Sequence, residues 1–269
     1  MPMRPKIAGI VLLVMLVLGA GQVSAQHRVS REPALWPELQ LDYVFKTTSF
    51  LYFRNHYRHV MDNDFNHLRE TNILQYLERI QFRLGYEHVF NPNWSAGISE
   101  AYAIERTRNI LFNEVYARHT WAIGKFRLTE RATFEHIMRW PKNDNGRFRF
   151  RADLDRPYKI GATTLRPRAS YELFFNIDYT PDPAAENRGV DRTRLRLDCQ
   201  VVLSDHVAIT PYFIRQSDYF LVEPAFDEDN NIIRDGGRQN HITPIWGLEA
   251  RFSVFKGGAS FPRNLPLNK

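Results

Sequence analysis

Apolar and polar residues alternate along most of the chain, and the clearest instance is the segment 146–155, Gly-Arg-Phe-Arg-Phe-Arg-Ala-Asp-Leu-Asp. Apolar side chains occupy Phe148, Phe150, Ala152 and Leu154, and every residue between them is charged. Because side chains alternate across a β-strand, this segment predicts a strand with one apolar face and one ionic face. A strand that has lipid on one side and a polar lumen on the other needs this pattern along its whole length.

The same period of two recurs through the rest of the chain. It is found in ten further segments, which are 38–46, 49–59, 79–90, 93–105, 110–121, 125–137, 163–176, 193–202, 206–219 and 241–255. These make eleven segments, whereas a closed antiparallel bacterial barrel has an even number of strands. We therefore predict ten or twelve strands, with 38–46 as a lead-in that does not span, or with two strands inside a long segment such as 73–90.

Three prolines and one glutamate interrupt the predicted strands. Proline removes a ladder hydrogen bond, so Pro167, Pro211 and Pro244 are expected near rims or bulges. Glu100 falls on an apolar face, and a bulge is expected to redirect it. No segment after the N-terminal apolar run shows a 3.6-residue apolar period, so little helix is expected there.

Short and long connections alternate between the predicted strands. The short ones lie at 46–49, 91–93, 122–125 and 204–205, and the longer polar ones at 62–71, 141–146, 180–189 and 223–240. Outer-membrane barrels have short periplasmic turns and longer loops on the other side. The expected fold is all-β, a transmembrane antiparallel up-and-down barrel over 37–255, with a lead-in at 26–36 and a tail at 256–269.

The first 25 residues are typical of a cleaved secretory signal. Arg4 and Lys6 precede an apolar run over 7–20, and Val23-Ser24-Ala25 offers a signal-peptidase site. The run is short for the alternative, an uncleaved membrane-spanning helix. Removing the signal lowers the formal net charge from +6 to +4. Cys199 is the sole cysteine, so an intrachain disulfide and a lipoprotein anchor at the cleavage site are both excluded.

Several stretches suggest a known family. They are Trp36 followed by two alternating strands, Phe-Arg-Asn-His-Tyr-Arg at 53–58, and Arg-Phe-Arg-Phe-Arg-Ala at 147–152. On these the chain resembles, over about 36–255, a family of uncharacterised Gram-negative outer-membrane barrels known as DUF2490. The resemblance implies a barrel in the outer membrane of a Gram-negative bacterium and implies no activity. The segment 247–255 is also similar to the terminal-strand signal of the barrel-assembly machinery, although residues 256–269 follow it. That machinery and outer-membrane lipid are therefore the expected partners.

The ionic faces of the strands are the candidate functional site. Fourteen arginines and eight acids are assigned to the lumen, an excess of six positive charges. The arginines are Arg54, Arg58, Arg79, Arg83, Arg118, Arg127, Arg131, Arg149, Arg151, Arg166, Arg168, Arg194, Arg196 and Arg251. The acids are Glu87, Glu114, Glu135, Asp153, Asp155, Glu172, Asp198 and Glu249. Arg149 and Arg151 are expected to face acids such as Glu135 or Glu172 on adjacent strands.

Two interpretations of this lumen stay open. Paired arginines and acids can fill a narrow barrel and make its wall rigid, which is a structural role. Unpaired arginines would instead favour anions, which predicts a narrow pore for small anionic solutes. No nucleic-acid partner, cofactor, metal site or catalytic residue is expected from the sequence.

Two other classes are alternatives. A soluble periplasmic barrel that binds a small apolar ligand would turn its apolar face inward. An outer-membrane lipid-modifying enzyme would need a serine and a histidine in a catalytic arrangement. Candidates for that arrangement are Ser99, Ser170, Ser204, Ser217, His56, His88, His119, His136 and His206. None lies in a nucleophile motif, and Ser204-Asp205-His206 is better explained as a turn.

Overall fold

The computed structural model describes residues 27–61, 77–140, 144–161, 163–179, 189–222, 225–226, 232–234 and 237–258. Two compact units divide the chain, one of Ser30–Tyr219 with His241–Lys269 and one of Met1–Val29 with Phe220–Asn240. The expected signal over 1–25 and most of the tail over 256–269 lie outside the described residues. Within the described ranges, no helix is long and apolar enough to cross a membrane.

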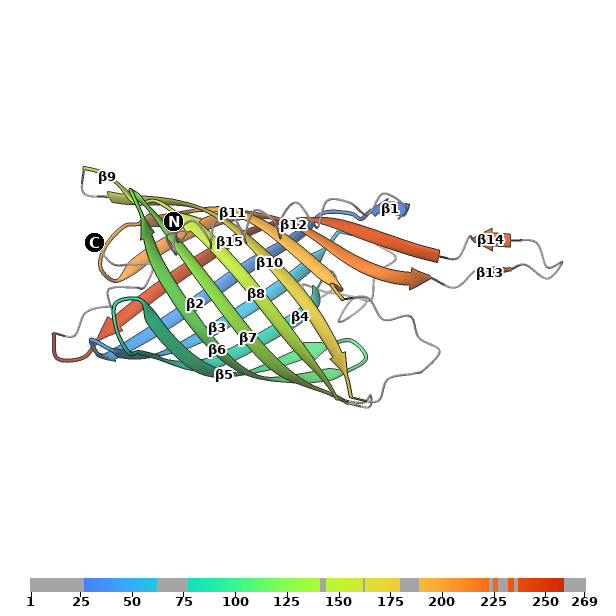
Figure 1. The fold of residues 1–269 in the computed structure, drawn as a ribbon, viewed down its shortest axis with the longest axis horizontal. Helices are drawn as coiled ribbons and strands as arrows, with labels where there is room; N and C mark the ends of the chain where they lie inside the picture. Colours follow the sequence, from blue (N-terminus) through green and yellow to red (C-terminus); the bar gives the residue numbers. More distant parts are fainter. Residues whose placement is uncertain are drawn as a thin grey trace, which may run out of the picture. The chain divides into compact units, whose positions relative to one another are not determined.

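The first of these units is a barrel of eleven strands that run obliquely to its axis (Figure 1). The strands are β2 (Ala34–Lys46), β3 (Ser49–Val60), β4 (Leu77–Val89), β5 (Trp94–Glu105), β6 (Asn109–Ile123), β7 (Phe126–Trp140), β8 (Asn145–Asp155), β10 (Thr163–Asp178), β11 (Arg192–Val202), β12 (Val207–Val222) and β15 (Gly237–Phe255). Four short strands complete the set, namely β1 (His27–Ser30), β9 (Tyr158–Ile160), which pairs with β10, and β13 (Ala225–Phe226), which pairs with β14 (Ile232–Arg234).

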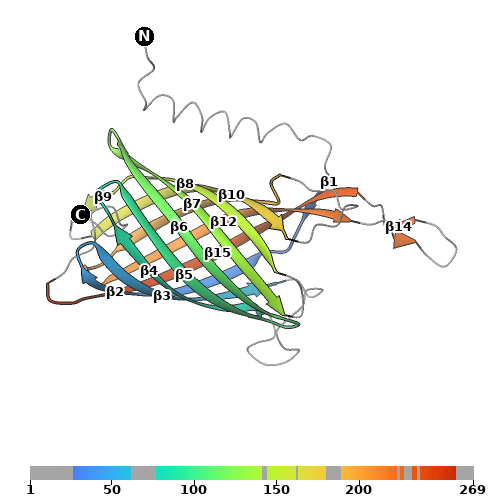
Figure 2. The ribbon, with the colours of Figure 1, turned by 60° about the horizontal axis from the view of Figure 1, so that its bottom comes forward.

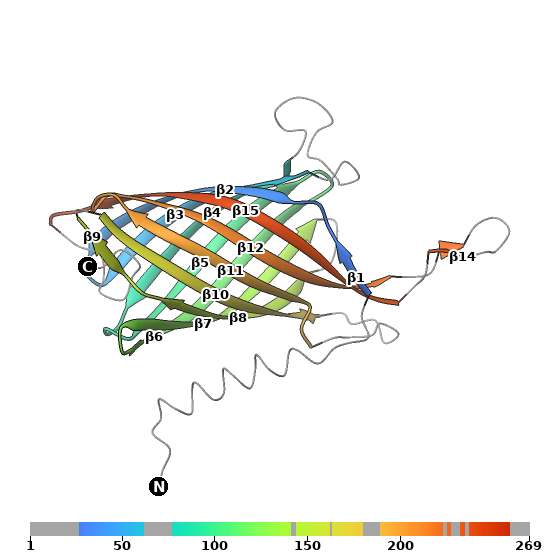
Figure 3. The ribbon, with the colours of Figure 1, turned by 90° about the horizontal axis from the view of Figure 1, so that it is seen from above.

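The barrel closes through a parallel pair of strands. Consecutive strands from β2 to β12 pair antiparallel, and β15 follows β12 in the sheet. The seam then pairs β15 with β2 in parallel, from Ile245 opposite Ala34 to Phe255 opposite Val44 (Figure 3). With an odd number of strands, the first and last run in the same direction.

The expected count of ten or twelve strands is therefore wrong. Residues 38–46 are part of β2, a full-length strand of 13 residues, and 77–89 form the single strand β4. The even-number rule applies to barrels in which every pair is antiparallel, and the parallel seam removes that condition here. The first barrel strand, β2, also begins at Ala34, inside the segment expected to be a lead-in.

Four short turns lie at one rim of the barrel, together with the connection 156–162 that carries β9 (Figure 2). The longest connections join strand ends at the other rim, the long-connection rim, which also has the short connection 106–108. The short turns occupy 47–48, 90–93, 124–125 and 203–206. Because Ala34 pairs with Val60, at the end of β3, the chain enters β2 at the rim that carries the connection 61–76. It leaves β15 at Phe255, which lies at the short-turn rim, opposite Val44.

The apolar face of each strand points outward. Along β8, Phe148 and Phe150 are 42% and 50% exposed, while Arg147, Arg149 and Arg151 between them form ion pairs inside the barrel. Large apolar side chains are exposed in the same way on the other barrel strands except β10, where the outward Tyr171, Leu173 and Phe175 are half-buried. An apolar outside around an ionic inside is the arrangement of a membrane-spanning barrel. The alternative of a soluble barrel with an apolar interior is therefore wrong.

Tyrosine rings cover glycines on the inner wall. A Cβ atom at each of three inward glycines would come within 2.0–2.4 Å of a tyrosine ring carbon on another strand. The pairs are Tyr52 over Gly85, Tyr116 over Gly97 and Tyr212 over Gly247. Only glycine leaves room for a ring to lie flat on the sheet, and the ring restores the packing that glycine lacks.

Glu100 is not redirected by a bulge. The register of β5 is continuous on both sides, with Glu100 opposite Leu84 on β4 and Asn113 on β6. Its side chain is exposed, on the same outward face as Ile98 and Tyr102. The alternation is therefore strong enough to keep one charged residue on the outer face.

The prolines within strands lie at interruptions or boundaries of the ladder. Pairing of β11 with β12 breaks between Tyr212 and Ile209, on either side of Pro211. Pro167 lies just beyond Arg168, where the pairing of β10 with β8 ends. Pro244 immediately precedes Ile245, the first seam pair.

Candidate functional site in the barrel interior

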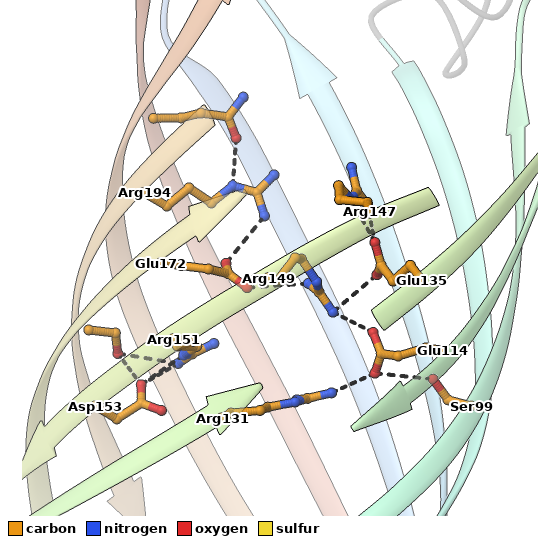
Figure 4. A network of polar contacts seen from close by, with 12 residues as sticks. Ser99, Glu114, Arg131, Glu135, Arg147, Arg149, Arg151, Asp153, Glu172 and Arg194 are labelled. Carbon is orange, nitrogen blue, oxygen red and sulfur yellow. Dashed lines mark hydrogen bonds and ion pairs between the residues drawn. The ribbon is translucent and has the colours of Figure 1, made fainter. Parts of the chain in front are cut away.

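Two buried glutamates form the centre of the ionic interior. Glu114 on β6 and Glu135 on β7 lie directly opposite each other, and they are 2% and 1% exposed. Like charges in this position destabilise a sheet unless other groups compensate them. Four arginines compensate them here, and the six side chains are called the central cluster: Arg83, Glu114, Arg131, Glu135, Arg147 and Arg149. Figure 4 labels all of them except Arg83.

The central cluster reaches across the interior. Arg83 on β4 places Nη1 2.9 Å from Oε2 of Glu114, and its Nη2 is 3.9 Å from Oε1 of Glu135, three strands away. Arg149 on β8 places Nη2 3.1 Å from Oε1 of Glu135 and also pairs with Glu114. Four guanidinium groups therefore face two carboxylates, which leaves the cluster with an excess of positive charge.

The network continues from the central cluster to strands β10 and β11. Arg149 Nη1 lies 3.3 Å from Oε1 of Glu172, and Arg194 Nη1 lies 3.9 Å from its Oε2 (Figure 4). Arg194 also donates to Oε1 of Gln216 on β12 over 2.7 Å. Polar side chains thus connect β6 to β12 through the interior.

A second group of contacts lies along the parallel seam. Tyr212 on β12 donates to Glu38 of β2 and lies 2.7 Å from the carbonyl oxygen of Trp36. Arg196 on β11 reaches Glu38 at 3.8 Å and Glu249 of β15 at 3.7 Å. At the seam itself Arg251 pairs with the fully buried Asp42. These contacts join the two ends of the sheet from inside.

Other expected interior residues form pairs along the wall. Arg118 lies 3.0 Å from Glu87, and Arg168 lies 2.9 Å from Asp198. The remaining pairs are Arg54 with Glu38, Arg79 with Glu105, Arg127 and Arg166 with Asp155, and Arg151 with Asp153. Arg151 therefore pairs with an acid of its own strand rather than with Glu135 or Glu172, because its Nη2 also bonds Ser170 on β10.

Arg58 differs from the other thirteen arginines assigned to the lumen. Among the described residues it has no ion pair, and its guanidinium lies 4.4 Å from the centre of the Trp36 ring. Arg194 approaches the same ring at 5.4 Å and Phe174 at 4.8 Å. The arginines Arg147, Arg149 and Arg192 also surround Phe174. Arginine and aromatic side chains therefore alternate in a row across the interior, from β3 through β2, β11 and β10 to β8. Cation–π contacts favour this arrangement.

Sequence reasoning missed several interior residues. They are Trp36, Glu38, Asp42, Tyr116, Arg147, Phe174, Arg192 and Tyr212. The alternation in 146–155 already placed Arg147 on the ionic face, and the alternation in 38–46 placed Asp42 there. The inward aromatic rings carried no such signal, because aromatic residues are equally common on lipid-facing positions.

Three of the serines considered for an enzyme form contacts with neighbouring side chains or with the backbone. Ser99 bonds Arg83 and Glu114, and Ser170 bonds Asp153. Ser204 accepts the backbone N–H of His206 and Val207, as expected for a turn. A different serine, Ser49, lies 2.8 Å from His88 Nδ1, but it is only 3% exposed and also bonds Tyr86. In the described part of the chain, no group of His, Cys, Asp or Glu is arranged to hold a metal ion.

Solved structures similar in shape include two bacterial proteins. LpxR from Salmonella typhimurium is 7% identical with a TM-score of 0.43, covering 76% of this chain and 84% of its own. An anion-selective porin from Comamonas acidovorans is 10% identical with a TM-score of 0.34, covering 75% of this chain and 59% of its own.

Sequence comparison identifies the family. No curated protein matches the chain. The family described as "Protein of unknown function (DUF2490)" matches residues 34–221, from the start of β2 almost to the end of β12. This match covers all but one of the barrel strands, and the chain belongs to the DUF2490 family.

Proposed function

We propose that this protein spans the outer membrane of a Gram-negative bacterium and that its lumen is a narrow passage for small anions. The exposed apolar exterior and the ionic interior support the membrane location. The signal-like N-terminus supports export through the secretory pathway. The proposal assigns no catalysis to the barrel.

The central cluster is the observation that carries the anion preference. Its four arginines exceed its two glutamates, and every one of these groups lies in the barrel interior. A small anion is attracted by this excess and can replace a carboxylate contact, whereas a cation meets net repulsion. The cluster therefore acts as the selectivity-determining constriction.

The same side chains limit the size of the passage. Barrels of eight strands are filled by their side chains, and those of sixteen or more enclose an open aqueous channel. Eleven strands lie between these limits, and the contact between Arg83 and Glu135 spans three strands of the wall. Only small solutes can pass such a network.

Planar bilayers test the proposal directly. The purified barrel is expected to give small, steady conductance steps, and in a KCl gradient its reversal potential should lie toward that of chloride. Arg149→Gln removes one positive charge from the central cluster and should shift the reversal potential toward zero. Phe150→Ala, one residue away on the outer face, is the matched control and should leave it unchanged. Silence of the wild-type barrel contradicts the passage.

A structural barrel with a filled lumen is the second candidate. Ion pairs between strands that are not neighbours, such as Arg149 with Glu114 and Arg196 with Glu38, favour it. Such pairs stiffen the wall without conducting. This function predicts bilayers that stay silent for the wild type and for Arg149→Gln alike.

A further inference from the structure

We infer that the interior near the long-connection rim holds a binding site for a small oxyanion, a carboxylate or a phosphate. Its side chains are Trp36, His56, Arg58 and Arg194, called the Arg58 site below. The inference deepens the proposed function, and it rests on that function only in requiring that solutes reach the interior. It gives the lumen a specific ligand class instead of a general preference for negative charge.

The first argument is a positive charge that forms no ion pair with any of the described residues. Arg58 on β3 lies directly opposite Arg79 on β4 in the ladder. Arg79 is compensated by Glu105, while the described residues supply Arg58 with no ion pair. Two like charges in register destabilise a sheet, and a partly buried charge without a partner adds a further cost. A bound anion would remove both costs.

The second argument is a set of polar atoms without partners. Trp36 Nε1, His56 Nε2 and Arg58 Nε are buried, and none has a hydrogen-bond partner among the described residues. Trp36 itself is 5% exposed, and its indole N–H can only donate. Unsatisfied buried polar groups are uncommon in folded proteins, and a bound ion is one of the explanations for them.

These atoms belong to side chains that are held together. The rings of Trp36 and His56 pack edge to face, with centroids 5.1 Å apart. The guanidinium of Arg58 lies 4.4 Å from the centre of the Trp36 ring, and that of Arg194 lies 5.4 Å from it. Contact with the ring holds each guanidinium in place and leaves N–H groups on its edge available to a ligand.

Arg194 adds a second, weakly compensated charge. Its nearest carboxylate is Glu172 at 3.9 Å, and that acid also serves Arg149 at 3.3 Å. Two guanidinium groups near one ring match an oxyanion, because each can donate two parallel hydrogen bonds to a carboxylate or phosphate. A halide has a single acceptor atom and cannot accept two parallel bonds on separate atoms, so the site should bind an oxyanion more tightly than a halide.

The position of the site fits entry from one side of the membrane. Arg58 is two residues before Val60, where β3 ends at the long-connection rim. The central cluster lies deeper, because Glu114 and Glu135 are each five residues from the same rim, at Asn109 and Trp140. An anion would therefore meet Arg58 before it meets the constriction.

Titration calorimetry of the full chain in detergent tests the site. Sodium phosphate and sodium acetate are each titrated against a background of sodium chloride at matched ionic strength. One saturable site is expected for at least one of the two, and this tells a phosphate ligand from a carboxylate ligand. Absence of saturable binding by both, or equal competition by chloride, overturns the inference.

Two variants locate the binding. Arg58→Gln should weaken it by about tenfold or more, the effect of losing one charge-assisted contact. Arg127→Gln is the matched control, because it lies at the short-turn rim and leaves Asp155 paired with Arg166. If Arg58→Gln fails to fold, Trp36→Phe keeps the ring and removes only the N–H, and it should weaken binding by about threefold to tenfold. Unchanged affinity in the variant that folds contradicts the site.

The bilayer experiment separates this inference from the proposed function. A conducting barrel without saturable oxyanion binding retains the passage and rejects the Arg58 site. A silent barrel whose phosphate or acetate binding depends on Arg58 retains the site and rejects the passage.

Discussion

The ring of Tyr212 on β12 lies against Gly247 on β15. A Cβ atom at position 247 would lie 2.0 Å from Cζ of the tyrosine. The hydroxyl of Tyr212 reaches beyond β15 to Glu38 and to the backbone of Trp36 on β2. One side chain therefore connects three strands across the parallel seam, and the absence of a side chain at Gly247 makes this possible.

Gly247→Ala should destabilise the barrel by displacing that ring. The methyl group would overlap the ring, so Tyr212 would have to leave Glu38, and a cost of about 1–3 kcal/mol is expected from overpacking. The temperature at which the protein loses its faster, unheated mobility on gels measures this effect. Gly189→Ala is the control, because a Cβ there meets nothing within 4 Å. Equal stability of the two variants would show that the ring does not need the glycine.

Tyr212→Phe tests the hydroxyl separately from the ring. Loss of the hydrogen bonds to Glu38 and Trp36 should lower stability by about 1–2 kcal/mol, since a buried carboxylate loses a donor. Unfolding in guanidinium, followed by tryptophan fluorescence, gives the value. Tyr171→Phe is the control, because Tyr171 lies on the outward face of β10, and the substitution should change the free energy of unfolding little. A similar loss in both variants would argue against a specific role at the seam.

Glu114→Gln should be among the most damaging single changes in the interior. It removes the charge that compensates Arg83, Arg131 and Arg149. Removing one partner of a buried ion pair costs about 3–5 kcal/mol. Equilibrium unfolding in lipid or detergent measures the loss, and Glu100→Gln, on the exposed outer face, is the control. A loss below about 1 kcal/mol would mean that the arginines find other partners.

Phe150→Arg tests the direction of the apolar face. Phe150 is the middle residue of β8 and is half exposed, so the proposed membrane location places it among lipid chains. Arginine at the midplane of a bilayer costs about 2–4 kcal/mol, and near an interface about 0–1 kcal/mol. Phe90→Arg, beside a short turn, should therefore cost less than Phe150→Arg when both are unfolded from bilayers. The opposite order would contradict the membrane location.

The fold was largely predictable from local alternation. Each of the eleven segments with a period of two forms a barrel strand, and the four short and four long connections expected from the sequence fall at opposite rims. The connections 106–108 and 156–162 were not expected, and in length they do not fit the rim at which each lies. The pattern succeeds because each strand has lipid-like surroundings on one side and charged neighbours on the other. Even Glu100, a charged residue at an apolar position, keeps the outward direction that the alternation of β5 gives it.

The closure and the aromatic interior could not be read in the same way. Alternation describes each strand alone, and nothing in it specifies whether the first and last strands meet in parallel. The pairing of Tyr212 with Glu38 joins residues 174 positions apart and depends on Gly247 between them. The partners of Arg151 depend on register, because Ser170 and Asp153 lie opposite each other on β10 and β8.

Because the number of strands is odd, the two ends of the barrel segment of the chain lie at opposite rims. The chain enters the barrel at Ala34 on the long-connection rim and leaves it at Phe255 on the short-turn rim. In a barrel with an even number of strands both boundaries would face the same compartment. In a bilayer, a protease confined to one side could therefore cut next to only one of them. An epitope tag placed before Ala34 and one placed after Phe255 would report on opposite sides of the membrane.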